Sequence, residues 1–131
     1  MAHEAQVVTT SARPTAVVAQ ATTWEKFPSV WMLWLDQVYA FLKTSDMTRS
    51  GHNVMLYQDD VPNVEVGVEV TGPFSPAGPV TPSVLPAGEA AMTIHRGPYD
   101  LLNAAHQAIR AWCVANGRPI TGCRWDLRRL A

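Results

Sequence analysis

Four side chains on two short segments combine aromatic faces with polar or polarisable atoms. Trp31 and Trp34 lie three residues apart on the apolar stripe of an expected helix. Met55 and Tyr57 lie on one face of an expected strand, which places a hydroxyl group beside a flexible thioether. Aromatic faces suit flat hydrophobic or cationic molecules. These four residues are candidate ligand contacts, although core packing accounts for the same spacing.

A second candidate region is the segment 85–100. It indicates a turn, a short strand and a Gly97-Pro98 corner that opens directly into a helix. His95 and Tyr99 flank this corner. We expect His95 to tie the turn through a backbone hydrogen bond, whereas Tyr99 either anchors the corner or faces a ligand.

The elements that must position these residues follow from hydrophobic periodicity. Strands are expected over residues 6–10 and 15–20, as two pieces or one bent strand, and over 53–58, 63–70, 89–96 and from 122. Helices are expected from Phe27-Pro28-Ser29 through residue 42 and over 99–116. Residues 71–86 contain five prolines and two glycines and are expected to form a loop.

The order of these elements indicates an internal repeat. A strand-helix-strand-strand unit is followed by a second unit whose last strand is missing. Two such units predict an α+β fold with one mostly antiparallel sheet and both helices packed on one face.

Composition limits the possible classes of function. The chain has 131 residues, 47% of them hydrophobic and 16% charged, and a formal net charge of −1. This size suits one domain, and this charge provides no basic field for nucleic acid or an anionic membrane surface. No apolar run approaches the roughly 20 residues that span a bilayer, and the N-terminus does not resemble a signal peptide. We therefore expect a cytoplasmic protein with no direct nucleic-acid or membrane partner.

The motifs of cofactor sites do not occur. The four histidines and two cysteines are scattered, without the spacing of metal ligands. Glycine-rich phosphate loops and serine nucleophile elbows do not occur either. We expect neither a metal nor an organic cofactor.

Several short motifs together carry a family resemblance over roughly residues 5–126. They are Val66-Gly67-Val68, Leu85-Pro86-Ala87-Gly88, His95-x-Gly97-Pro98-Tyr99-Asp100, Ala105-His106, Trp112 and Gly117. In this order and spacing the chain resembles a GyrI-like small-molecule-binding domain. That domain is also the effector-binding half of many MerR-type and AraC-type transcription regulators.

The C-terminal residues depart from this resemblance. Trp125-Asp126 fits the aromatic-acidic pair of the family's next strand, but residues 127–131 do not continue its pattern. The interpretation is one GyrI-like domain over residues 1–131 that is truncated or frameshifted after residue 126. A missing last strand would leave a sheet edge unpaired and favour dimerisation, so monomer and homodimer both stay open.

The resemblance gives Asp126 a specific expected role. The family carries an acidic residue here, usually Glu, in an apolar and aromatic pocket. A carboxylate in such a pocket can pair with a cationic ligand, whose charge offsets the cost of desolvation. Trp125 should point to the opposite face of the strand.

Three functions remain open from the sequence. The first is a stand-alone domain that binds hydrophobic small molecules, including cationic or aromatic ones. The second is a hydrolase of strained-ring electrophiles, in which Asp126 acts on water as a general base with Tyr57 or Trp31 nearby. The third is a ligand-free inhibitor of a partner protein. Binding is favoured over catalysis.

Overall fold

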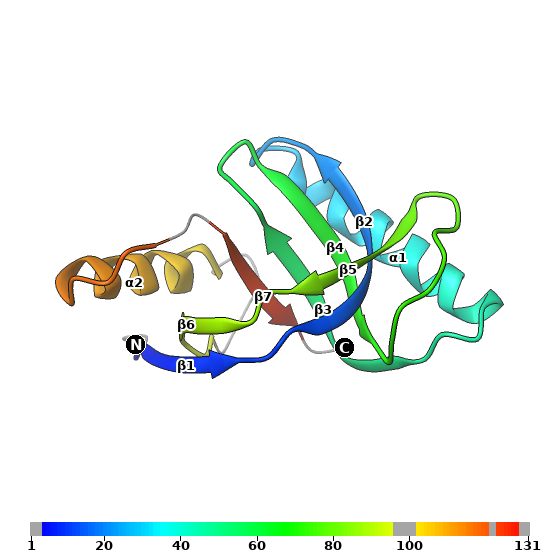
Figure 1. Ribbon diagram of the computed structural model, residues 1–131. Coiled ribbons are helices and arrows are strands. Elements are labelled where there is room, and N and C mark those ends of the chain that lie inside the picture. The colour runs from blue at the N-terminus through cyan, green and yellow to red at the C-terminus, as the bar shows by residue number, and fades with distance from the viewer. Residues whose placement is uncertain (1–3, 96–101, 121–122, 129–131) are drawn as a thin grey trace. The chain divides into compact units, whose positions relative to one another are not determined.

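The computed structural model describes residues 4–95, 102–120 and 123–128. These residues form two helices and seven strands, which confirms the α+β class (Figure 1). In chain order the elements are β1 (Gln6–Thr10), β2 (Arg13–Ala21), α1 (Phe27–Thr44), β3 (Arg49–Tyr57), β4 (Asn63–Val70), β5 (Val80–Leu85), β6 (Gly88–Met92), α2 (Leu102–Ala115) and β7 (Arg124–Arg128). The chain divides into two compact units, one within residues 1–11 and 87–121 and the other within 12–86 and 122–131.

The larger unit contains a five-stranded antiparallel sheet in the order β5-β2-β4-β3-β7. Its central strand β4 has the boundaries predicted from the strict alternation of valine. These valines lie on one face and belong to the main hydrophobic core, whose buried members are Ala16, Val18, Phe27, Leu35, Val38, Met55, Tyr57, Val64, Val66, Val68, Val70 and Val80.

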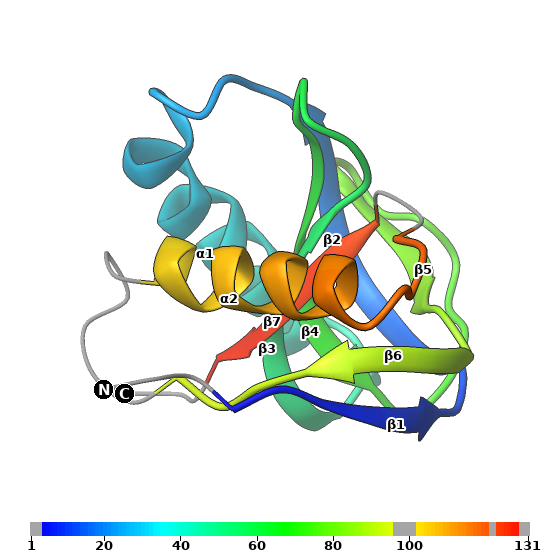
Figure 2. The ribbon, with the colours of Figure 1, turned by 90° about the vertical axis from the view of Figure 1, so that its left-hand side faces the viewer.

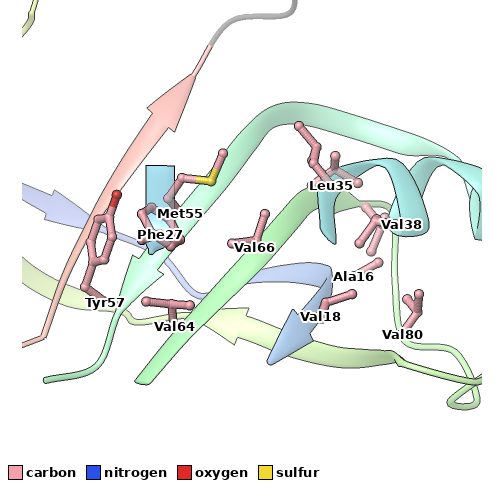
Figure 3. Close-up of a cluster of buried hydrophobic side chains, with 12 residues drawn as sticks. Ala16, Val18, Phe27, Leu35, Val38, Met55, Tyr57, Val64, Val66 and Val80 are labelled. Carbon is pink, nitrogen blue, oxygen red and sulfur yellow. The ribbon is translucent and has the colours of Figure 1, made fainter. Parts of the chain in front are cut away.

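Helix α1 packs on this face of the sheet and begins where the sequence predicted. Thr23 accepts hydrogen bonds from the backbone N–H groups of Lys26 and Phe27, and proline occupies the first turn of the helix. Leu35 and Val38 are the helix residues most deeply buried against the strands (Figure 3). The amphipathic stripe therefore supplies the helix side of the core.

The prediction of a loop over residues 71–86 was wrong for its second half, which forms β5. Among the strands that the structure describes, β5 pairs only with β2, where Pro82 lies opposite Ala16, so β5 is an edge strand. An edge strand tolerates proline because one side of its backbone has no neighbouring strand that needs an N–H donor. Val80 and Leu85 are almost fully buried and anchor the strand. The five prolines of residues 71–86 led to the prediction of a loop, although Val80 and Leu85 are buried strand residues.

The smaller unit contains α2 and the two-stranded antiparallel sheet of β1 and β6 (Figure 2). Helix α2 packs against β6, and Ala105 and Cys113 are its buried residues. The strands therefore form two hydrogen-bonded sheets instead of the single sheet predicted. The two ladders are interrupted between Leu85 and Gly88, where Pro86 has no N–H to donate and Gly88 has a φ of 127°.

Among the described residues, α2 is followed by one strand, β7, which extends to Arg128. Neither of the two helices in the described residues is both long and apolar enough to cross a membrane.

The central position of β4 predicts a strong effect of truncation at Val66, which is 0% exposed. Val66→Ala should lower the free energy of unfolding by about 2 kcal/mol, because it removes two buried methyl groups and leaves a cavity. Val84→Ala is the matched control, because Val84 is 50% exposed on the edge strand β5. It should cost less than about 1 kcal/mol. Denaturant unfolding of both variants measures this difference, and equal losses would contradict the assigned core.

Candidate functional site

Strand β7 brings Asp126 into contact with Tyr57. The antiparallel register places Asp126 opposite Met55 and Arg124 opposite Tyr57, so alternate side chains of both strands share the face covered by α1. The Tyr57 hydroxyl donates a hydrogen bond of 3.2 Å to Asp126 Oδ2. Both residues are buried, with exposed fractions of 5% for Tyr57 and 8% for Asp126.

Arg128 completes this buried group. Its Nε and Nη2 atoms donate to the same Asp126 oxygen at 3.0 and 2.8 Å, and Nη2 also lies 3.4 Å from the Tyr57 hydroxyl oxygen. The guanidinium carbon lies 4.7 Å from the centre of the Trp31 ring, within cation–π range. Tyr57, Asp126, Arg128 and the Trp31 ring are called the polar cluster below.

The electrostatics of the polar cluster keep Tyr57 in its neutral form. Burial raises the pKa of Tyr57 far above its ordinary value, the Asp126 charge raises it further, and Arg128 opposes these effects. The neutral phenol can therefore donate to the carboxylate, while the Arg128 guanidinium balances the buried negative charge. This arrangement fits the rule that buried charges in proteins are paired.

Further aromatic and charged groups surround Tyr57, and one of them, Phe27, lies beside it in Figure 3. Its ring lies 5.6 Å from that of Phe27 and 5.5 Å from that of Trp24, measured between ring centres. The guanidinium of Arg124 lies 5.1 Å from the centre of the Trp24 ring and 3.4 Å from Asp60 Oδ1. Tyr57 thus connects the polar cluster to a second cation–aromatic contact.

The structure brings together three of the six residues proposed from the sequence as ligand contacts, namely Trp31, Tyr57 and Asp126. Met55 is 0% exposed and lies in the core beside them, opposite Asp126. Trp34 is half-buried and packs on Phe27, with 6.4 Å between ring centres. Tyr99 lies outside the described residues.

Sequence reasoning missed Arg128 because residues 127–131 were interpreted as a departure from the family pattern. The available signal was the spacing of two residues between Asp126 and Arg128, which places opposite charges on the same strand face. Trp125 packs near Leu56 on the other face, as the alternation predicted.

That other face carries a separate ion pair in which the carboxylate is buried. Glu69 is 5% exposed, and its carboxylate lies 2.9 Å from the Arg13 guanidinium and accepts a 3.0 Å hydrogen bond from the backbone N–H of His52. A side chain at Gly51 would collide with this carboxylate. These contacts tie β3 to β4 and β2. Within the described part of the chain, no three His, Cys, Asp or Glu residues could hold a metal ion together.

The fold is similar to that of the protein EcmrR. One solved structure, an EcmrR–DNA complex within a larger assembly named EcmrR-RPo, superposes with a TM-score of 0.81 at 22% sequence identity, over 94% of this chain and 48% of that one. The crystal structure of the EcmrR C-terminal domain gives a TM-score of 0.79 at 20% identity, over 94% of this chain and 82% of that one.

These comparisons establish the fold that the chain shares with the EcmrR C-terminal domain. The chain spans about half the length of the DNA-bound EcmrR chain, with 48% covered. No known protein family matches the chain, and no curated protein matches it in sequence.

The raised pKa of Tyr57 predicts a loss of stability in alkaline solution. The phenol of the unfolded chain ionises near the ordinary tyrosine pKa of 10.0, whereas the folded phenol stays protonated to higher pH. Above pH 10 the unfolded state therefore binds fewer protons, and the free energy of unfolding should fall by up to about 1.4 kcal/mol per pH unit. Tyr57→Phe should remove this part of the decline.

Denaturant unfolding between pH 8 and pH 11 measures the effect in the wild type and in Tyr57→Phe. Tyr39→Phe is the matched control, because Tyr39 is a less buried tyrosine on α1 whose pKa is also raised by burial. The part of the alkaline decline in the free energy of unfolding that comes from Tyr57 should persist in Tyr39→Phe. An identical alkaline decline in the wild type and in Tyr57→Phe would refute the protonated state assigned to the polar cluster.

Proposed function

We propose that this chain is a small-molecule-binding domain of the kind that senses effectors in transcription regulators. Its ligands are hydrophobic molecules, with aromatic and cationic ones among them. The polar cluster carries the proposal, because it places a buried carboxylate, a neutral phenol and an indole ring together in a fold shared with the EcmrR C-terminal domain.

The energetics of the polar cluster favour a functional role over a purely structural one. Removing two charges from water costs several kcal/mol per ion, and well-packed hydrophobic residues of similar size often stabilise a protein as well or better. Buried ionisable groups with perturbed pKa values are more frequent at binding and catalytic sites. The shifted pKa of Tyr57 beside Asp126 fits this pattern.

Each group in the polar cluster has a distinct use in binding. The Trp31 ring offers a flat face to aromatic or cationic molecules. The Tyr57 hydroxyl and the Asp126 carboxylate fix orientation through hydrogen bonds, as the few polar groups of ligand sites usually do. The identity of EcmrR as a DNA-bound protein suggests that, in a longer protein, such binding would control a DNA-binding part.

The contacts of Asp126 favour binding over hydrolysis. A general base needs a lone pair that can accept a proton from water. Asp126 Oδ2 already accepts hydrogen bonds from the Tyr57 hydroxyl and from two nitrogens of Arg128. These donors compete with a water molecule for the lone pairs of this oxygen.

Ligand binding should change tryptophan fluorescence. We expect the neutral dye Nile red to quench the emission with saturation at micromolar dye, and the cationic dye crystal violet to do so at higher concentrations, because Arg128 already pairs with Asp126. Trp31→Phe should weaken the response, because Trp31 belongs to the polar cluster. Trp125→Phe is the control and should respond as the wild type does, because Trp125 lies on the other sheet face. A flat response to both dyes would favour the alternative of a partner-protein inhibitor.

A turnover assay separates the binding domain from the hydrolase. Styrene oxide, an aromatic epoxide, should be hydrolysed no faster with the protein than in buffer, and Asp126→Asn should not change this rate. The diol product is measured by chromatography. Turnover by the wild type that disappears in Asp126→Asn would establish the hydrolase and remove the binding-only proposal.

A further inference from the structure

The guanidinium of Arg128 makes the contacts that a bound cation would need at this site. It donates twice to Asp126 Oδ2, approaches the Tyr57 hydroxyl at 3.4 Å and lies 4.7 Å from the centre of the Trp31 ring. Arg128 is only 8% exposed, so this charge is removed from water like that of a bound ligand. A group of this chain therefore fills the position beside the carboxylate.

The shape of this group indicates which cations the position accepts. A guanidinium is planar and delocalised, so it can lie against an aromatic ring while two of its nitrogens donate to a carboxylate. An alkylammonium is a compact, strongly hydrated charge with different donor geometry and cannot reproduce this arrangement. The observed contacts fit amidinium and guanidinium groups, which share the planar pair of N–H donors.

Charge balance requires exchange at this position. Asp126 is paired with the guanidinium of Arg128 at 2.8 Å, and the neighbouring Arg124 lies near Asp60. A second cation beside Asp126 would add an unbalanced charge in a buried place, which is costly. A ligand cation that replaces the Arg128 guanidinium keeps the balance.

The location of Arg128 makes such an exchange feasible. It lies on β7, which among the described strands is hydrogen-bonded only to β3 and is an edge strand of the sheet. Its side chain can rotate away while the backbone ladder between β7 and β3 stays intact, because the contacts to Asp126, Tyr57 and Trp31 are made by side-chain atoms.

We propose that Arg128 determines the specificity of this site by occupying its cation position, and that the cations bound there are planar amidinium or guanidinium compounds that replace the Arg128 guanidinium. This inference rests on the proposed binding function. It predicts that the wild type binds such cations weakly, because every binding event must displace Arg128, and that removal of the side chain strengthens binding.

Calorimetric titration with benzamidinium chloride tests the proposal. Arg128→Ala should bind benzamidinium at least about tenfold more tightly than the wild type, because the competing internal group is gone. Benzamide, the neutral analogue of benzamidinium, should show no such gain in affinity. The double variant Arg128→Ala/Asp126→Asn should lose the gain in affinity for benzamidinium. Arg110→Ala is the matched control, since it removes one positive charge from an exposed position on α2 and should bind as the wild type does.

A stability measurement covers the case in which Arg128→Ala is too unstable for titration. Millimolar methylguanidinium should raise the melting temperature of this variant above the value in methylammonium at equal ionic strength, because only the planar cation replaces the lost group. Equal affinity of the wild type and Arg128→Ala, or equal melting temperatures in the two salts, would overturn the role of Arg128. If the wild type still binds the dyes, the proposed binding function survives that result.

Discussion

The antiparallel pairing of β7 with β3 is the interaction on which the polar cluster depends. It places Asp126 and Arg128 on the same face as Tyr57, although almost 70 residues separate the two strands (the Tyr57–Asp126 separation is 69). The partner strand β3 is held in turn by the valine-rich central strand β4. The hydrophobic core under α1 thus fixes the position of a group of charges that could not hold itself together in water.

The polar cluster combines opposing physical effects. Burial strengthens every electrostatic contact within it, because the local dielectric constant is low, but burial also makes any unpaired charge expensive. Asp126 and Arg128 satisfy each other, while Tyr57 stays neutral and bonds to both. Trp31 covers the guanidinium. The polar cluster therefore has little net charge, and in the proposed site this favours exchange of Arg128 for a ligand of the same charge over capture of an additional ion.

The structural comparison and the short motifs of the sequence bear on the fold by separate routes. The motifs indicated a GyrI-like resemblance from residue types and spacing, and the structural comparison shows the fold of the EcmrR C-terminal domain at 20% identity. At this level of identity the backbone arrangement is shared while most side chains differ. The chemistry of this chain therefore depends on its own residues, and Arg128 is the example.

Local patterns in the sequence determined most of the elements. Strict alternation defined β4, the apolar stripe and Pro28 defined α1, and strand alternation separated Trp125 from Asp126, because these features depend on short-range periodicity. Only the tertiary structure decided that a proline-rich segment forms the edge strand β5, since its pairing with β2 is long-range. It also decided that Arg128 lies on Asp126, Tyr57 and Trp31, because that contact requires β3, β7 and α1 to meet.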